Sequence, residues 1–162
     1  GLGDVYKRQG SQKGCGISVI RYATQKDENA IYELLCELEG MSLDKEGFHE
    51  AYRDYMKDDK MHCLVAEMDK EVVGVLNLRI GTMLCRCGKI GEIVELAVRN
   101  GMRSQGIGHG LFQEAYHIAR EAGCVRFEVS TNRTRLGAHR FYEREGMERS
   151  HYRFIRYFPI EK

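Results

Sequence analysis

The residues whose types and spacing point most directly to chemistry form a short glycine-containing loop, Arg103-Ser104-Gln105-Gly106-Ile107-Gly108. The loop follows a strand-like run, Gly91 to Val98, and precedes a stretch with helical patterning. The first N–H groups of a helix have no intrahelical acceptor, and the helix dipole adds about half a positive charge there. Glycine at 106 and 108 would let a phosphate approach these groups without a Cβ in the way. The loop therefore predicts an anion site suited to a diphosphate.

Two common phosphate-binding loops do not fit these residues. A P-loop requires lysine after its last glycine, and the pair Gly101 and Gly106 has the right spacing but is followed by Ile107. A dinucleotide-binding loop requires a third glycine at position 111, which is Leu111 in this chain. The pattern that remains is Arg-x-x-Gly-x-Gly.

This pattern resembles the loop with which the GNAT superfamily of acyl-CoA-dependent N-acetyltransferases binds the coenzyme A pyrophosphate. The resemblance extends from about Ile17 to Phe158. It implies an enzyme that acetylates an amine, with acetyl-CoA as cosubstrate and no covalent enzyme intermediate. The residues expected to contact the coenzyme are Leu96, Ala97 and Val98 in the strand, Arg103, Ser104, Gln105, Gly106, Ile107, Gly108 and His109 at the loop, and Asn132 before the last helix.

Two glutamates in the strand before the loop are candidates for the general base that takes a proton from the substrate ammonium. Strict alternation of side chains along a strand places Glu92 and Glu95 on opposite faces. The distance from Arg103 places Glu92 where many members of the superfamily have a catalytic carboxylate. A β-bulge, common in this strand of the superfamily, would instead turn Glu95 inward. Both glutamates remain candidates.

Acetyl transfer also uses an oxyanion stabiliser and a proton for the departing thiolate. Backbone N–H groups around Leu96 to Val98 would stabilise the oxyanion, where the strand separates from its neighbour. Tyr142 lies in a segment that resembles the late helix of the superfamily, whose tyrosine acts as general acid. These residues complete the predicted catalytic set.

Several short strings look more specifically like the aminoalkylphosphonate N-acetyltransferases. The strings are Gly91-Glu92-Ile93-x-Glu95-Leu96, Ser130-Thr131-Asn132, Ala138-His139-Arg140-Phe141-Tyr142-x-Arg144-Glu145-Gly146 and Ser150-His151-x-Arg153-Phe154. This likeness implies a small amine that carries a phosphonate, with Arg133, His151 or Arg153 available for its anionic end. Alternatives are another amine, such as a polyamine, an aminoglycoside or a protein N-terminus, and a non-catalytic acyl-CoA sensor.

The elements that must position these residues can be read from hydrophobic periodicity and turn residues. Strands are expected at 17–23, 61–68, 71–80, 89–98, 125–130 and 151–158, and helices at 31–38, 45–56, 111–122 and 136–145. A loop is expected from Gly81 to Gly88. The element order matches the GNAT fold, an α/β (α+β) mixed, mostly antiparallel sheet with helices on both faces. Residues 1–16 show no period and are expected to be a disordered or added tail, followed by a single domain over 17–162.

Composition narrows the setting further. The chain has 25 basic and 24 acidic side chains among 162 residues, so neither nucleic acid nor an anionic membrane is an expected partner. Six cysteines without a framework spacing, and no apolar signal segment, favour a reducing cytoplasm. Cys85-x-Cys87 is read as a turn, so no metal is expected. A homodimer is compatible with the resemblance, although no interface can be identified.

Overall fold

The computed structural model describes residues 6–8 and 18–160. The chain divides into two compact units, residues 1–129 and residues 130–162. The first unit contains the sheet and three of the α-helices, and the second contains the last helix. None of the described helices combines the length and the apolarity that crossing a membrane would require.

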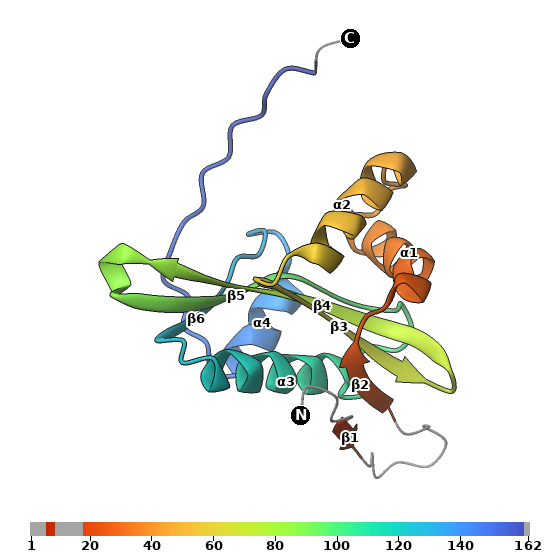
Figure 1. Ribbon diagram of the computed structural model, residues 1–162. Coiled ribbons are helices and arrows are strands. Elements are labelled where there is room, and N and C mark those ends of the chain that lie inside the picture. The colour runs from red at the N-terminus through yellow and green to blue at the C-terminus, as the bar shows by residue number, and fades with distance from the viewer. Residues whose placement is uncertain (1–5, 9–17, 161–162) are drawn as a thin grey trace. The chain divides into compact units, whose positions relative to one another are not determined.

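A mixed sheet runs through the first unit, and its strands follow one another in chain order (Figure 1). Its strands are β1 (Tyr6–Arg8), β2 (Ser18–Tyr22), β3 (Met61–Met68), β4 (Glu71–Met83), β5 (Gly88–Val98) and β6 (Arg126–Val129). Neighbouring strands are antiparallel from β1 to β5, whereas β5 and β6 are parallel. This arrangement confirms the predicted mixed, mostly antiparallel sheet.

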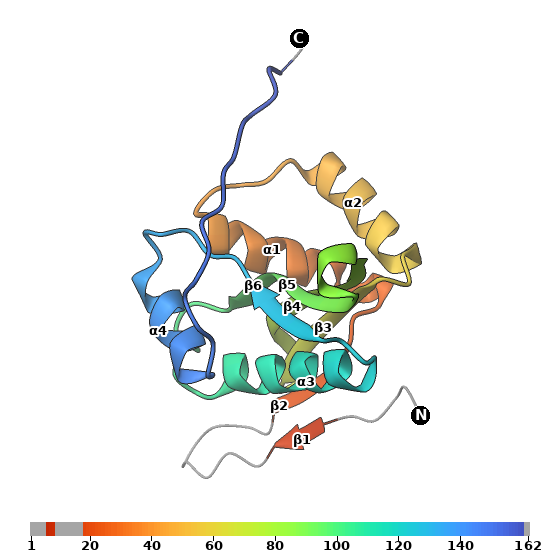
Figure 2. The same cartoon turned by 90° about the vertical axis from the view of Figure 1, so that its left-hand side faces the viewer.

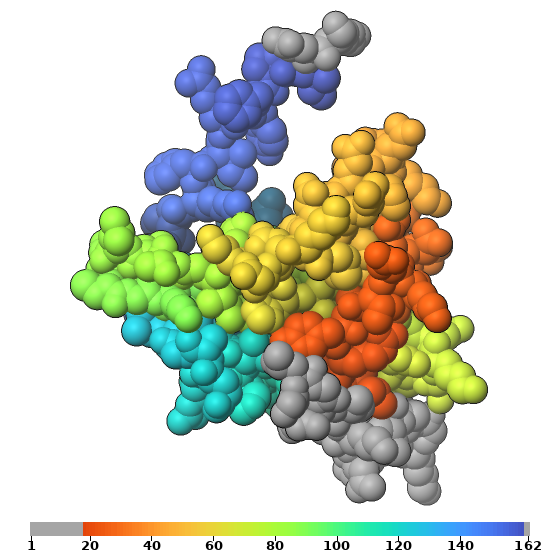
Figure 3. Space-filling view, in the orientation of Figure 1, coloured from red at the N-terminus to blue at the C-terminus, as the bar shows by residue number. Residues whose placement is uncertain are grey.

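Helices cover both faces of the sheet, as predicted. Helices α1 (Glu28–Glu39) and α2 (Lys45–Lys57) lie on one face, and α3 (Ile107–Glu121) lies on the other (Figures 1 and 2). The space-filling view shows the atoms of α1 and α2, in orange to yellow, and those of α3, in teal, on opposite sides of the green strands (Figure 3). A site between the sheet and helices α1 and α2 would therefore lie on the opposite face of the sheet from α3.

The predicted helical spacing corresponds to buried faces. Ile31, Leu34 and Leu35 of α1 are buried in one core cluster with Tyr52 of α2. Helix α1 ends at Gly40, whose φ of 68° is in the left-handed region that favours glycine at a helix end. On the other face, the buried residues of α3 are Ile107, Gly110, Leu111, Phe112, Ala115 and Ala119. Both helices are thus fixed to the sheet by apolar stripes.

The predicted loop from Gly81 to Gly88 is wrong in its bounds, because only residues 84–87 lie outside the strands. Strand β4 continues to Met83, and a short 3₁₀ turn, η2 (Leu84–Arg86), leads directly into β5 at Gly88. Gly81 and Gly88 indicated a loop, yet they pair with Ile90 and Met83 in the β4–β5 ladder. Glycine can occupy an interior strand position where the ladder supplies the stability that the residue itself does not. Cys85 and Cys87 lie in this connection, with exposed side chains.

The second unit contains α4 (Leu136–Arg144) and an extended segment after it. The predicted strand at 151–158 is wrong, because the described residues of this segment form neither a helix nor a strand. Its aromatic residues are exposed, with Tyr152 and Phe154 each 94% accessible. A strand requires a paired neighbour, and residues 130–160 supply none within this unit.

The segment at 1–16 is described only in part. Tyr6–Arg8 forms strand β1, paired with Ser18–Ile20 of β2, which the aperiodic sequence did not predict. The rest of the expected tail lies outside the described residues, as do Ile17 and Cys15. The expectation of a single domain over 17–162 stays a prediction.

Candidate active site

The glycine loop has the geometry expected of an anion site. Ser104 and Gly106 have φ of 69° and 80°, and α3 begins at Ile107 with Gly106 as its N-cap. The first i→i−4 hydrogen bond of the helix runs from the Gly110 N–H to the Gly106 carbonyl, at 3.0 Å. The N–H groups of Ile107 and Gly108 come before it and therefore have no acceptor within the helix.

The surroundings of this helix start also fit a bound diphosphate. No atom lies within 4 Å of the position that a Cβ on Gly106 would occupy. The first turn of α3 has no acidic residue, and the side chain of Arg103 is exposed beside it. A coenzyme pyrophosphate would therefore meet backbone donors and a guanidinium, without a competing carboxylate from this turn.

Strand β5 provides a second set of backbone donors. The Arg99 N–H donates to the Val73 carbonyl at 2.8 Å. Alternate residues of an antiparallel strand direct their N–H groups to the same neighbour, so the Ala97 N–H faces β4, whereas those of Leu96 and Val98 face away from it. On that side, pairing with β6 ends at Ile93. Within the described residues, β5 thus separates from β6 where Leu96 and Val98 present their N–H groups.

A β-bulge decides where the two glutamates of β5 point. Asn77 of β4 pairs with Glu95, and the next residue, Leu78, pairs with Ile93, so Val94 is an extra residue in β5. Glu92 pairs with Arg79, which is two residues from Asn77 and therefore on the same face of β4. Glu92 and Glu95 consequently share one face, and the prediction of opposite faces from strict alternation is wrong.

The two carboxylates have different surroundings on that face. Glu92 forms an ion pair with Arg79, and the side chains of both residues are partly accessible, at 34% and 53%. Glu95 instead lines a cavity of about 130 Å³ between the sheet and helices α1 and α2. The other residues that line the cavity are Ile31, Leu35, Phe48, Ala51, Tyr52, Tyr55, Cys63 and Asn77. None of these described lining residues is cationic.

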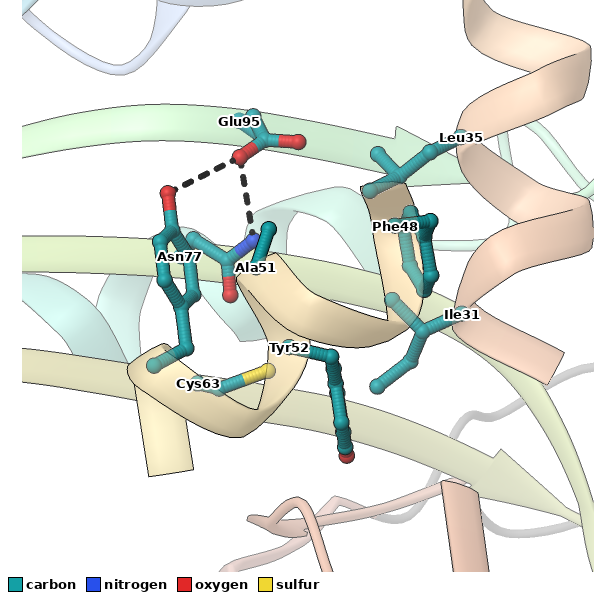
Figure 4. Close-up of a pocket in the computed structure, with 9 residues that line it drawn as sticks. Ile31, Leu35, Phe48, Ala51, Tyr52, Cys63, Asn77 and Glu95 are labelled. Atoms are coloured by element: carbon teal, nitrogen blue, oxygen red, sulfur yellow. Dashed lines mark hydrogen bonds between the residues drawn. The ribbon is translucent and has the colours of Figure 1, made fainter. Parts of the chain in front are cut away.

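Two hydrogen bonds hold Glu95 from different elements. Tyr55 of α2 donates its hydroxyl, and Asn77 of β4 donates its Nδ2, both to Oε1 of Glu95 at 3.3 Å (Figure 4). No hydrogen bond to Oε2 occurs within the described residues. Burial raises the pKa of Glu95, and the two hydrogen bonds lower it in part. The cavity therefore contains a partly buried carboxyl group with one oxygen available.

Comparison with known proteins identifies the family. The model of the acetyltransferase (GNAT) family matches residues 28–147. The aminoalkylphosphonate N-acetyltransferase of Salmonella typhimurium is 41% identical over 137 residues, which cover 85% of this chain and 89% of that protein. The chain belongs to the GNAT acetyltransferase family.

Solved structures agree with this assignment. A protein from Bacillus halodurans C-125, described as a transcriptional regulator, superposes on this GNAT acetyltransferase with a TM-score of 0.81 at 28% identity. The superposition covers 87% of this chain and 99% of that one. An aminoglycoside N-acetyltransferase in complex with CoA gives a TM-score of 0.78 at 14% identity, covering 91% of this chain and 98% of that one, which shows a common fold.

The second unit of the GNAT acetyltransferase contains the remaining predicted residues. Asn132 lies before α4, and its Oδ1 accepts hydrogen bonds from the backbone N–H and hydroxyl of Thr134 at 3.0 and 2.8 Å. Arg133, His151 and Arg153 are exposed. Tyr142 lies on α4 with its ring 5.2 Å from that of Phe141, and burial raises the pKa of Tyr142 to about 12.

The two residues that form hydrogen bonds with Glu95, Asn77 and Tyr55, were not predicted to belong to the site. Asn77 interrupts the apolar run Val72–Leu78 of a buried strand, and a lone polar residue in such a run is a usable signal. Tyr55 is three residues after Tyr52 and seven after Phe48, a helical stripe that indicates packing as readily as chemistry. Only the fold brings Tyr55 and Asn77 to Glu95.

Proposed function

We propose that this enzyme transfers the acetyl group of acetyl-CoA to the primary amine of a small molecule, with Glu95 as general base. The observation that carries the proposal is the Glu95 carboxyl group in the cavity, with one oxygen outside its two hydrogen bonds. A raised pKa makes a carboxylate a stronger base toward an ammonium group. Glu92, whose carboxylate is in an ion pair with Arg79, is the second candidate.

The reaction proposed is direct attack of the neutral amine on the thioester. A carbon–nitrogen bond forms, the carbon–sulfur bond breaks, and the sulfur leaves as a thiolate that takes up a proton. Cys63 also lines the cavity, but burial raises the pKa of its thiol to about 12, so the thiolate is scarce at neutral pH. This supports a mechanism without an acyl-cysteine intermediate.

Backbone and side-chain donors would assist the transfer. The N–H groups of Leu96 and Val98 are proposed to stabilise the developing oxyanion. Tyr142 is proposed to donate to the departing thiolate, because a phenol with a pKa of about 12 keeps its proton at neutral pH. Tyr142→Phe should lower kcat about tenfold or more in a thiol-release assay and leave coenzyme affinity nearly unchanged. Equal kcat values would exclude this role.

Acetyl-CoA is proposed to bind with its pyrophosphate at the start of α3. Ser104, Gln105, Gly106, Ile107, Gly108 and His109 are the proposed contacts, with Arg103 beside them and Asn132 toward the pantetheine arm. Support comes from the left-handed Gly106, the N–H groups of Ile107 and Gly108, and the absence of an acidic first turn. The GNAT family uses acetyl-CoA as its acyl donor.

An aminoalkylphosphonate is the proposed acceptor. The support is 41% identity over most of the chain to the Salmonella typhimurium enzyme named for that activity. The described residues that line the cavity include no cation, so the amine and its carbon chain suit the cavity better than a phosphonate does. Arg133, His151 and Arg153 are proposed to bind the anionic end, as the resemblance to the aminoalkylphosphonate N-acetyltransferases implies.

A free-thiol release assay with acetyl-CoA tests the acceptor. The panel contains aminoalkylphosphonates of two chain lengths, the alkylamines of matching length, a polyamine, an aminoglycoside and a peptide with a free N-terminus. The expected result is the highest kcat/KM for an aminoalkylphosphonate, well above that of the alkylamine of equal length. Turnover confined to the peptide or the aminoglycoside would contradict the proposed acceptor and leave the acetyltransferase activity in place.

A further inference from the structure

On the face of the sheet that borders the cavity, three side chains form a row across neighbouring strands, and one of them, Asn77, has no role in the proposed reaction so far. The strand register places Cys63 of β3 opposite Asn77 of β4, and Asn77 opposite Glu95 of β5. All three line the cavity, and Tyr55 of α2 reaches the same carboxyl group. Asn77 is 3% exposed, although its side chain is fully polar.

The orientation of Asn77 follows from its partner. Its Nδ2 faces Oε1 of Glu95, because the amide oxygen would repel a carboxylate at that distance. Oδ1 of Asn77 is consequently buried without a hydrogen-bond partner within the described residues. An unpaired buried carbonyl costs about 1–3 kcal/mol, so packing alone does not favour asparagine at this position. Its contact with Glu95 gives a reason for its presence.

Tyr55 supplies the second bond from another layer of the structure. It is 40 residues from Glu95 in the chain and comes from α2, whereas Asn77 comes from the neighbouring strand. Burial raises the pKa of Tyr55 to about 12, with Glu95 as a further cause, so its hydroxyl remains a donor at neutral pH. Two donors from two directions restrict the rotation of a side chain that has three rotatable bonds.

We propose that Tyr55 and Asn77 are positioning residues that hold Oε1 of Glu95 and thereby direct Oε2 to the acceptor amine. This inference rests on the proposed role of Glu95 as base and adds the residues that set its orientation and its proton affinity. Both bonds stabilise the carboxylate form, and each therefore opposes the effect of burial.

Other titratable groups near Glu95 do not replace these two donors. Tyr52 of α2 and Cys63 of β3 have raised pKa values because of burial and stay neutral at pH 7. Glu39, at the end of α1, acts at longer range and raises the pKa of Glu95. Arg79 of β4 and Glu92 of β5 form an ion pair, so their opposite charges largely cancel at Glu95. Tyr55 and Asn77 are thus the hydrogen-bond donors whose removal should raise the pKa of Glu95.

The test combines Tyr55→Phe and Asn77→Leu with a carboxyl titration and a pH profile. Glu95 is followed by NMR in protein labelled with ¹³C at the glutamate carboxyl carbon, its signal assigned by loss in Glu95→Gln. Each variant should titrate at higher pH than the natural chain. The kcat/KM of each variant should be about three- to tenfold lower than that of the natural chain on the acid side of the pH profile. At alkaline pH most of this difference should disappear.

Tyr52→Phe is the matched control, because it also removes a tyrosine hydroxyl from α2. The hydroxyl of Tyr52 donates to the Thr24 carbonyl at 2.5 Å and not to Glu95. It should leave the titration of Glu95 unchanged. The inference is overturned if Glu95 titrates alike in the natural chain, Tyr55→Phe and Asn77→Leu, or if these variants lose activity equally at every pH. A shifted NMR titration together with full turnover of Glu95→Gln would keep the hydrogen-bond roles and reject Glu95 as the base.

Discussion

Glu95 and Glu92 lie three residues apart on one face of β5, but only Glu95 lines the cavity. Glu95→Gln should lower kcat about 10²- to 10⁴-fold, because the amide cannot take a proton from the ammonium, and should change the affinity for coenzyme A little. Glu92→Gln is the matched variant, since it alters the same strand at an ion pair outside the cavity, and its kcat should change less than tenfold. Steady-state kinetics with calorimetric coenzyme binding measures both. The reverse order of effects would assign the base to Glu92.

Glu95 should also reduce the stability of the folded protein at neutral pH. Because the fold raises the pKa of Glu95 above its ordinary value, the stabilisation from its protonated form is present at low pH and is lost as pH rises through the folded-state pKa. Glu95→Gln, which does not titrate, should therefore have a higher Tm than the natural chain at pH 7. The difference should shrink as the pH is lowered toward 4. Calorimetric Tm values across this range check the trend, and a constant difference would indicate another cause.

At the scale of elements, α3 combines an apolar stripe with an open N-terminus. Gly106 before this helix and Gly123 after it both have φ of 80°, and neither has an atom within 4 Å of a built Cβ. Alanine at either position should cost about 1–2 kcal/mol of stability through backbone strain. Only Gly106→Ala should also weaken coenzyme A binding, by about tenfold, because its Cβ would crowd the anion site. Tm measurements and calorimetric titration separate the two effects, and equal coenzyme affinities would place the diphosphate elsewhere.

The β4–β5 pair shows how one residue changes the site. Without Val94 as the extra residue of the bulge, the alternation of β5 would place Glu92 and Glu95 on opposite faces. The bulge also comes just before the part of β5 that separates from β6. A local irregularity in one strand thus places a carboxyl group in the cavity, close in sequence to backbone N–H groups that no neighbouring strand pairs within the part of the chain that the structure describes.

At the scale of the whole molecule, Arg153 of the second compact unit is among the residues proposed to bind the anionic end of the acceptor. Arg153→Ala should raise KM for an aminoalkylphosphonate about tenfold, through loss of a charge-assisted hydrogen bond, and leave KM for the alkylamine of equal length unchanged. Arg149→Ala is the control in the same unit, because Arg149 forms a surface ion pair with Glu143. Steady-state kinetics with both acceptors gives the comparison. Equal changes for the two acceptors would indicate a structural effect of Arg153.

The extent of the prediction from sequence differs between the fold and the site. Strands β3 and β5 and helices α1, α2 and α3 follow from local periodicity, and the glycine loop from contiguous residues. A last strand was predicted over His151–Phe158, but the residues of a segment do not by themselves supply a neighbouring strand. For the general base, the sequence left two candidates, Glu92 and Glu95, and did not decide between them.

The sequence by itself determined the family and most of the element order, and it predicts an anion site at the start of α3, because these depend on residues close together in the chain. The tertiary structure decided that Glu95 lines the cavity and that Tyr55 and Asn77 bond to it. These contacts join residues 40 and 18 positions apart in the chain. They depend on strand register and helix packing, and a shift of one residue in a strand reverses the face that a side chain occupies.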